Sequence, residues 1–261
     1  MTPLLEARDI TVSFGRGAGA FQAVQQATIS VGPGEAIGIV GESGSGKSTL
    51  ARVLVGLQRP TYGEVLLESK PIFGVQASSH FPRQERWKAQ MVFQDPYSSL
   101  NPRQRAWETV AEAVHVWQGR KGDEAKAEAL KLLRGMGISE EQAQSFPKSL
   151  SGGQRQRVSV ARALAPKPKV LIADEPTSSI DQSAQAQLLN LLSQLQQERD
   201  VAIVFISHDL SLVRYLTSRV YVMSNGRIVE SGDTLSVFER PRHEYTRLLI
   251  SSIPGRRAGD L

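Results

Sequence analysis

The segment from Gly41 to Thr49 constrains this chain more than any other feature. It matches the phosphate-loop pattern G-x-x-x-x-G-K-[ST] at every specified position. The glycines allow backbone N–H groups to face phosphate oxygens, and the helix that follows adds the positive end of its dipole. Residues Glu35 to Val40 predict a buried strand before the loop, and Lys47 to Leu57 predict a helix after it. We therefore expect an α/β protein that binds a nucleoside triphosphate.

The residues of this loop have distinct expected roles. Lys47 is expected to reach the β- and γ-phosphates, Ser48 to hold Mg²⁺ through its hydroxyl, and Thr49 to bond the α-phosphate. The remaining residues are expected to contribute mainly backbone N–H groups. The full set of expected nucleotide contacts here is Gly41, Glu42, Ser43, Gly44, Ser45, Gly46, Lys47, Ser48 and Thr49.

Two carboxylates follow the apolar run Val170–Ala173, which is typical of a buried parallel strand. Ligands of open α/β sheets bind at the carboxyl ends of the strands, so Asp174 and Glu175 are expected beside the phosphate loop. Asp174 suits the support of Mg²⁺, and Glu175 suits the general base that polarises the attacking water. Taken alone, the pair could also stabilise a helix N-terminus through the helix dipole.

Gln94 and His208 also follow apolar runs. Gln94 comes after Met91–Phe93 and could bond Mg²⁺ or the attacking water, whereas His208 comes after Val201–Ile206 and could donate to the γ-phosphate. By position alone, each is more simply an ordinary polar residue at a strand end.

The turn Ser151-Gly152-Gly153 opens a predicted helix that runs to Leu164. A hydroxyl, backbone N–H groups and a helix N-terminus together form an anion site. Serine is also a favoured N-cap, so a capped helix is the simpler interpretation of this turn on its own.

The N-terminal part of the chain predicts antiparallel strands ahead of the core, at Ile10–Phe14 and Ala27–Val31. A further strand is predicted at Gly63–Glu68. Residues 69–88 lack a clear period, and their Ser, Pro and Gly content predicts an insertion loop.

Helical spacing from about Pro102 to Ala165 indicates a helical subdomain inserted in the α/β core. Within it, Asp123 is expected to cap a helix and Gly137 to end it. Beyond it, a hairpin around Asn225-Gly226 is expected to close the chain's sheet. Alternating strands and helices predict a parallel sheet with helices on both faces.

Composition excludes several kinds of functional site and of protein. The 261 residues contain no cysteine, which excludes disulfides, thiol catalysis and cysteine-ligated clusters within them. The net charge of +5 is too small to indicate nucleic-acid binding by itself. No apolar run reaches the roughly 18–20 residues that span a bilayer, and the N-terminus lacks the layout of a signal peptide, so we expect a cytoplasmic chain.

Together these segments resemble ABC-type ATPases in motif order and spacing over nearly all of residues 4–255. The motifs are the phosphate loop, Gln94 as the Q-loop, Leu150-Ser151-Gly152-Gly153-Gln154 as the signature, Leu171–Pro176 as Walker B, Ser178–Asp181 as the D-loop, and His208 as the switch histidine. The resemblance implies a P-loop NTPase (RecA-like) parallel-sheet core with an N-terminal antiparallel β subdomain. It implies one nucleotide-binding domain over residues 1–255, a helical insertion at about 95–165 and a short flexible tail at 256–261.

The same resemblance implies that two such domains pair head-to-tail around ATP and Mg²⁺. Glu175, His208, Gln94 and Lys47 would serve catalysis, and Ser48, Gln94 and Asp174 would hold Mg²⁺. The partner's ATP would contact Ser151, Gly152, Gly153, Gln154 and Asp181. An aromatic side chain would stack on adenine; Phe14 is expected, with Phe21 as the alternative.

Two further segments resemble the importer ATPases for oligopeptides, dipeptides and nickel. They are the Q-loop segment Val92–Arg103 and the tail segment Arg242–Leu249 with Ser252-Ile253-Pro254. Glu244 departs from the proline usual in that tail, and Ser179-Ile180 departs from the commoner Ala-Leu. The chain ends soon after the tail motif, which favours the nickel or metal-chelate branch slightly.

These resemblances imply partners at the cytoplasmic face of a membrane. They are a second ATPase subunit, identical or not, two transmembrane permease subunits and an extracytoplasmic substrate-binding protein; no nucleic acid is expected. The alternative is a soluble ABC-type ATPase module, such as a carbon–phosphorus-lyase-like accessory subunit. Transport is favoured because the chain has neither a second nucleotide domain nor a long coiled-coil insertion.

Overall fold

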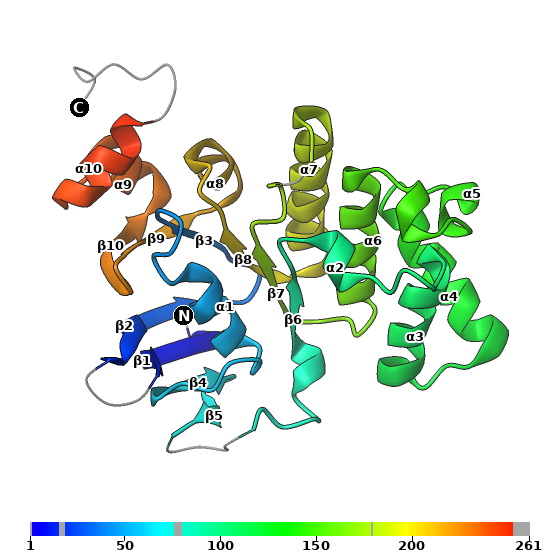
Figure 1. Ribbon diagram of the computed structural model, residues 1–261, viewed down its shortest axis with the longest axis horizontal. Coiled ribbons are helices and arrows are strands. Elements are labelled where there is room, and N and C mark those ends of the chain that lie inside the picture. Colours follow the sequence, from blue (N-terminus) through cyan, green and yellow to red (C-terminus); the bar gives the residue numbers. More distant parts are fainter. Residues whose placement is uncertain (1, 16–18, 76–79, 179, 253–261) are drawn as a thin grey trace.

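The computed structural model describes residues 2–15, 19–75, 80–178 and 180–252. Its strands form two sheets (Figure 1). The four-stranded antiparallel sheet has the order β2 (Phe21–Val31), β1 (Leu5–Phe14), β4 (Tyr62–Leu67) and β5 (Lys70–Gly74). The predicted tail at 256–261 and Ser179 of the D-loop lie outside the described residues.

The second sheet has six strands and carries the nucleotide motifs. Its order is β10 (Arg227–Asp233), β9 (Arg219–Ser224), β3 (Ala36–Val40), β8 (Ala202–Ile206), β7 (Val170–Asp174) and β6 (Ala89–Val92). Neighbours pair in parallel except β9 and β10, which form the predicted hairpin around Asn225-Gly226. The carboxyl ends of β3, β6, β7 and β8 therefore meet at one edge of the sheet.

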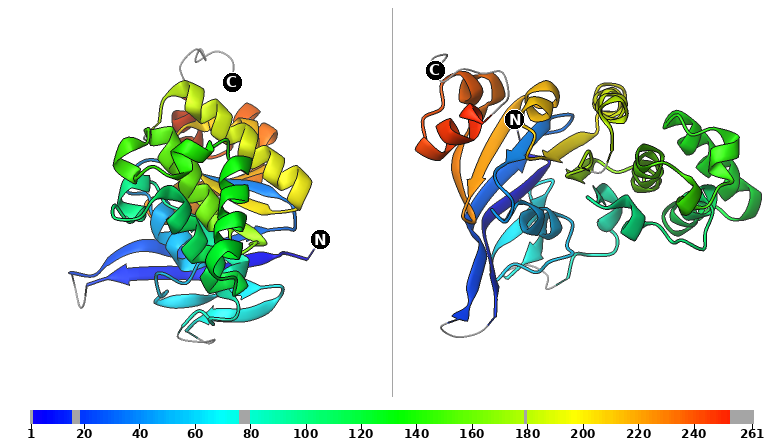
Figure 2. Two further views of the ribbon diagram at one scale, coloured as in Figure 1. Left: turned by 90° about the vertical axis from the view of Figure 1, so that its right-hand side faces the viewer. Right: turned by 45° about the horizontal axis from the view of Figure 1, so that its top comes forward.

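Helices connect these strands and extend beyond them. They are α1 (Lys47–Leu54), α2 (Pro96–Ser99), α3 (Ala106–Gln118), α4 (Gly122–Gly135), α5 (Glu140–Ala143), α6 (Gly152–Leu164), α7 (Gln182–Arg199), α8 (Leu210–Leu216), α9 (Thr234–Glu239) and α10 (Glu244–Ser251). Helices α3 to α5 lie at the end of the molecule farthest from α9 and α10, as Figure 1 and the right view of Figure 2 show. Among the described residues, no helix is long and apolar enough to cross a bilayer.

The six-stranded sheet separates two hydrophobic cores, as alternation along β8 illustrates. Ile203 and Phe205 pack with the core that includes α6, α7 and α8. Val204 and Ile206 pack with the opposite core, formed by α1 and the four-stranded sheet. The α/β class, the antiparallel subdomain and the prediction of helices on both faces of the sheet are thus confirmed. On the second face, α1 shares the core with the strands of the antiparallel sheet.

Two predicted boundaries were wrong near the phosphate loop. Helix α1 ends at Leu54 and not at Leu57, because Gly56 adopts a left-handed φ of +73° and lies against Phe81. Residues 69–88 are not one loop, since Lys70–Gly74 forms β5 on the edge of the antiparallel sheet. Pro71 disfavoured the prediction of a strand here, although an edge strand tolerates proline.

The predicted helix cap at Asp123 was also wrong. Helix α4 begins at Gly122, with Lys121 at the N-cap, which is two residues before the predicted cap, and Asp123 lies in its first turn. A carboxylate there is favoured by the helix dipole without acting as a cap. The predicted stop is confirmed, because Gly137 follows the helix with a left-handed φ of +69°.

We predict that Gly38→Ala destabilises the protein. Gly38 lies in the buried strand β3, and an added Cβ would lie 2.4 Å from Cγ1 of Val213 on α8. Overpacking of this kind costs about 1–3 kcal/mol, which urea denaturation measures as a lower free energy of unfolding. The matched control is Gly135→Ala, where nothing lies within 4 Å of the added carbon. Equal unfolding free energies for the two variants would contradict the packing described here.

Candidate functional site

The phosphate loop is fixed by two close approaches of its backbone to neighbouring strands. A Cβ on Gly41 would lie 2.1 Å from the carbonyl oxygen of Met223 on β9, and φ there is +151°. A Cβ on Gly46 would lie 2.2 Å from the carbonyl oxygen of Ala23 on β2, with φ at +103°. Only glycine fits these positions, so both sheets determine the shape of the loop.

Lys47 begins α1 and turns back into the loop. Its Nζ donates to the carbonyl oxygens of Gly41 at 2.8 Å and Glu42 at 2.7 Å. Burial lowers the pKa of Lys47, while the nearby carboxylates of Glu175 and Asp174 act in the opposite direction. The side chain thus brings a positive charge into the centre of a loop of backbone N–H groups, which suits a phosphate.

Ser48 and Asp174 join the loop to the end of β7. The Ser48 hydroxyl donates to Oδ1 of Asp174 at 3.0 Å. Burial raises the pKa of Asp174, and the bond from Ser48 offsets part of that effect. Among the described residues, no group of three or more His, Cys, Asp or Glu side chains could hold a metal ion. Oxygen donors from Ser48 and Asp174 fit Mg²⁺, which often completes its shell with water and phosphate oxygens.

Glu175 and His208 form a direct contact at the same edge. Nδ1 of His208 lies 2.6 Å from Oε2 of Glu175, and the Glu175 side chain is largely buried. The Glu175 backbone has a left-handed φ of 49°, and its N–H donates to the carbonyl of Ile206 on β8 at 2.9 Å. Such a conformation is costly for a residue other than glycine and is frequent at functional sites. Here it turns the chain sharply as β7 ends.

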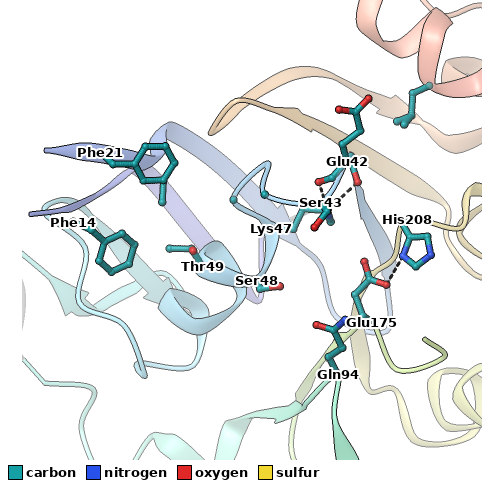
Figure 3. A pocket seen from close by; sticks show the side chains of 15 residues that line it. Phe14, Phe21, Glu42, Ser43, Lys47, Ser48, Thr49, Gln94, Glu175 and His208 are labelled. Atoms are coloured by element: carbon teal, nitrogen blue, oxygen red, sulfur yellow. Dashed lines mark hydrogen bonds and ion pairs between the residues drawn. The ribbon is translucent and has the colours of Figure 1, made fainter. Parts of the chain in front are cut away.

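One cavity of about 730 Å³ gathers most of the predicted side chains (Figure 3). Its lining comprises Phe14, Phe21, Ala23, Gly41, Glu42, Ser43, Gly44, Gly46, Lys47, Ser48, Thr49, Gln94, Glu175, His208 and Leu249. Phe14 and Phe21 lie at one end, and Gln94, Glu175 and His208 lie at the other, with the loop between them. Both phenylalanines line the cavity, so the choice between them stays a prediction.

The signature turn lies elsewhere. Ser151 caps α6, with its Oγ accepting the N–H of Gln154 at 3.2 Å and the Gln154 side chain accepting the N–H of Ser151 at 2.8 Å. None of Ser151, Gly152, Gly153, Gln154 and Asp181 lines the cavity of its own chain. A Cβ on Gly153 would lie 2.8 Å from Cβ of Ala184, whose N–H bonds Asp181. The turn and the start of α7 are therefore packed together.

Sequence reasoning missed the contacts that join the Gln94 segment to the signature helix. The guanidinium of Arg155 lies 5.6 Å from the centroid of the Tyr97 ring, and its Nη1 donates to the carbonyl of Leu150 at 2.5 Å. Arg162 donates to the carbonyl of Ser99. These arginines are seven residues apart on α6 and so share a face, but no local pattern names α2 as their partner.

Sequence reasoning also assigned no site role to Leu249, which lines the cavity from α10. The tail segment that contains Leu249 was visible in the sequence as a motif. What the motif could not show is that α10 returns to the phosphate loop, some two hundred residues earlier in the chain.

Comparison with protein families agrees with this geometry. The ABC transporter family model matches residues 24–178, which include the phosphate loop, Gln94, the signature and Walker B. A second model, described as the C-terminal region of oligopeptide/dipeptide transporters, matches residues 229–261. The two matches support both levels of the resemblance inferred from the motifs.

Curated relatives point the same way. A probable peptide ABC transporter ATP-binding protein of Sinorhizobium fredii is 48% identical over 233 residues, which cover 89% of this chain and 65% of that protein. A di/tripeptide transport ATP-binding protein of Pseudomonas aeruginosa is 42% identical and covers 97% of this chain and 80% of its own. An oligopeptide transport ATP-binding protein of Bacillus subtilis is 40% identical, with coverages of 96% and 82%. The chain thus spans about two thirds to four fifths of these relatives.

Solved structures share the fold. An ATP-binding cassette solved as a dimer in a post-hydrolysis state with ADP and Pi has a TM-score of 0.78 and 29% identity, covering 88% of this chain and 98% of its own. A component of an ABC transporter complex of Clostridium perfringens has a TM-score of 0.77 and 27% identity, with coverages of 96% and 95%. With the motifs, the cavity and the relatives in agreement, the chain belongs to the ABC transporter family of ATPases, in its group of oligopeptide and dipeptide transport ATP-binding proteins.

Proposed function

We propose that this chain hydrolyses ATP to drive a peptide importer, and that its cavity holds the nucleotide. The observation that carries the proposal is the meeting of Lys47, Gln94, Glu175 and His208 around one phosphate loop. The triphosphate would lie along the loop, with Lys47 beside the β- and γ-phosphates. Phe14, or Phe21 in its place, would stack on the adenine.

Three oxygen-bearing side chains fit a Mg²⁺ ion at this site. Ser48, Asp174 and Gln94 would hold it together with phosphate oxygens. Bound there, the ion would neutralise charge on the phosphates. Lys47 provides a second positive charge at the loop, fixed by the carbonyl oxygens that it already contacts.

Glu175 is the proposed general base for the attacking water. Its carboxylate is largely buried and turned toward the cavity, and His208 contacts one of its oxygens. A carboxylate held by one partner keeps its other oxygen free to accept a proton from water. His208 would orient Glu175 and donate toward the γ-phosphate, and Gln94 would contact the water from the opposite wall.

The site requires a second cassette to be complete. None of the five residues proposed to act on a neighbour's nucleotide lines the cavity of its own chain. Ser151 and Asp181 are exposed, Gly152 and Gln154 are half-buried, and the buried Gly153 would contribute through its backbone. The N-terminus of α6 offers backbone N–H groups and a positive dipole end to a γ-phosphate. The dimeric cassette with ADP and Pi is consistent with such an arrangement. The partner subunit would be either a second copy or a related chain.

In a transporter, the movement of the two cassettes toward each other around ATP must be passed to membrane subunits. We propose two permease subunits and a substrate-binding protein as partners, with this chain at the cytoplasmic face of the membrane. The helices between residues 95 and 165 would act as the inserted subdomain that carries the motion. Peptides are the favoured cargo because the curated relatives quoted above are peptide transport proteins; nickel or a metal chelate is the alternative.

We predict that Glu175→Gln retains ATP binding and loses turnover. The amide keeps the size of the side chain but cannot accept the proton, and general-base catalysis contributes roughly 10²–10⁴-fold. Steady-state phosphate release should fall by about that factor, and size-exclusion chromatography with ATP should show a trapped dimer. The matched control is Glu198→Gln on the exposed end of α7, which should behave as wild type. Turnover near wild type in Glu175→Gln would remove Glu175 from the role of base.

Lys47→Ala should weaken nucleotide binding itself. The substitution removes the positive charge at the loop, and charge-assisted bonds to phosphate are among the stronger protein contacts. Titration calorimetry should show MgATP affinity lowered by roughly tenfold or more. Tight MgATP binding by this variant would contradict the placement of the triphosphate along the loop.

Purification with partners separates transport from a soluble role. Affinity capture of the tagged chain from membranes should recover polytopic permease subunits. Addition of the loaded binding protein to the reconstituted complex should then raise ATP turnover. Recovery of a soluble complex in place of permeases would favour the accessory-ATPase alternative, and mass spectrometry of the binding protein's ligand would identify the cargo.

A further inference from the structure

The C-terminal helix α10 reaches the phosphate loop through one tyrosine. The hydroxyl oxygen of Tyr245 accepts the backbone N–H of Glu42 at 2.9 Å, a contact that joins residues 203 positions apart. One turn later on the same helix, Leu249 lines the nucleotide cavity. The helix thus touches the site at two levels, by a polar contact with the loop and by an apolar contact with the cavity wall.

The start of α10 is held firmly in place. The carboxylate of Glu230, on β10, accepts the backbone N–H groups of Arg242 at 2.8 Å and His243 at 3.0 Å. His243 caps the helix, because its Nδ1 accepts the N–H of Tyr245 at 3.2 Å. Ile250 is buried in the core that includes α6, α7 and α8, and Tyr245 and Leu249 pack against that same core. These contacts fix where the Tyr245 hydroxyl lies.

Two side chains form hydrogen bonds with the peptide groups on either side of Glu42. Lys47 donates to the Glu42 carbonyl, and Tyr245 accepts the Glu42 N–H. The crest of the loop at Gly44 is open, since an added Cβ would meet nothing within 4 Å. The Tyr245 contact involves a different atom and does not depend on Lys47.

We propose that Tyr245 is a positioning residue for the ATP site, and that α10 is a strap that keeps the phosphate loop in its nucleotide-binding shape. The proposal deepens the function given above and rests on the nucleotide lying along this loop. Its physical basis is preorganisation, because a loop that is already ordered loses less conformational entropy when the ligand binds. It also gives a role to the tail motif, whose His243 and Tyr245 build the strap.

The test is Tyr245→Phe, which removes one hydroxyl and keeps the ring. Loss of a single hydrogen bond of this kind should raise the Kd for MgATP about three- to tenfold. The KM for ATP should rise by a similar factor while kcat changes less than twofold, because the contact acts on the loop and not on the reacting atoms. Tyr215→Phe is the matched control, since that hydroxyl donates to Asn190 on α7 at 2.9 Å and does not line the nucleotide cavity.

A second variant tests the strap through its anchor. Glu230→Gln removes the charge that holds the start of α10, so it should raise the Kd for MgATP in the same direction as Tyr245→Phe. The double variant should lose less affinity than the product of the two single effects, because both act through one contact. If the two substitutions raised the Kd independently, so that their effects multiplied in the double variant, the proposal that α10 acts as a strap would be overturned.

The outcomes separate this proposal from the assignment of the ATP site. Unchanged Kd and KM in Tyr245→Phe, with binding lost in Lys47→Ala, would overturn the role of Tyr245 and leave the ATP site standing. Unchanged binding in both variants would overturn the site itself. If Tyr215→Phe raised the Kd as much as Tyr245→Phe, the effect would be one of general stability, and the strap would fall.

Discussion

The parallel pairing of β3, β7 and β8 is the constraint on which the rest of the site depends. Parallel strands end at the same edge of a sheet, and each of these strands is buried along its whole length. The phosphate loop follows β3, Asp174 ends β7 and is followed by Glu175, and His208 comes after β8. A polar side chain placed after any of these strands is therefore delivered to the same place. The two hydrophobic cores on either side of the sheet supply the free energy that maintains this alignment.

Around that edge, backbone contacts determine the shape of the site as much as side chains do. Gly41 and Gly46 allow the loop to lie against β9 and β2, and Glu175 bends sharply where β7 ends. At the far side of the loop, Tyr245 adds a contact from the C-terminal helix. A nucleotide would thus meet a loop that β9, β2 and α10 already hold. This order favours tight phosphate binding at a low entropic cost.

The same fold leaves the signature turn away from its own cavity. Ser151 and Asp181 cap neighbouring helices, and Gly153 lets those helices approach closely. Arg155 and Arg162 connect that unit to the segment after Gln94. A change at Gln94 can therefore reach the signature turn, which is the surface proposed above to face a second cassette. Such a connection is what a motor requires, since hydrolysis in one place must move another.

The sequence by itself determined the chemistry and the class of the fold. Phosphate binding needs glycines, a lysine and a helix start in one short run, so the segment from Gly41 to Thr49 could be recognised from its sequence. The order of the motifs indicated the family. Tertiary structure decided what depends on contacts distant in the chain. Pro71 and Asp123 misled local reasoning, because edge pairing and the actual start of α4 overrode the local signals. The sequence also could not predict the contact of Tyr245 with Glu42 or the hydrogen bond from Arg162 to α2. The type of a side chain alone does not say which backbone group a distant element will present.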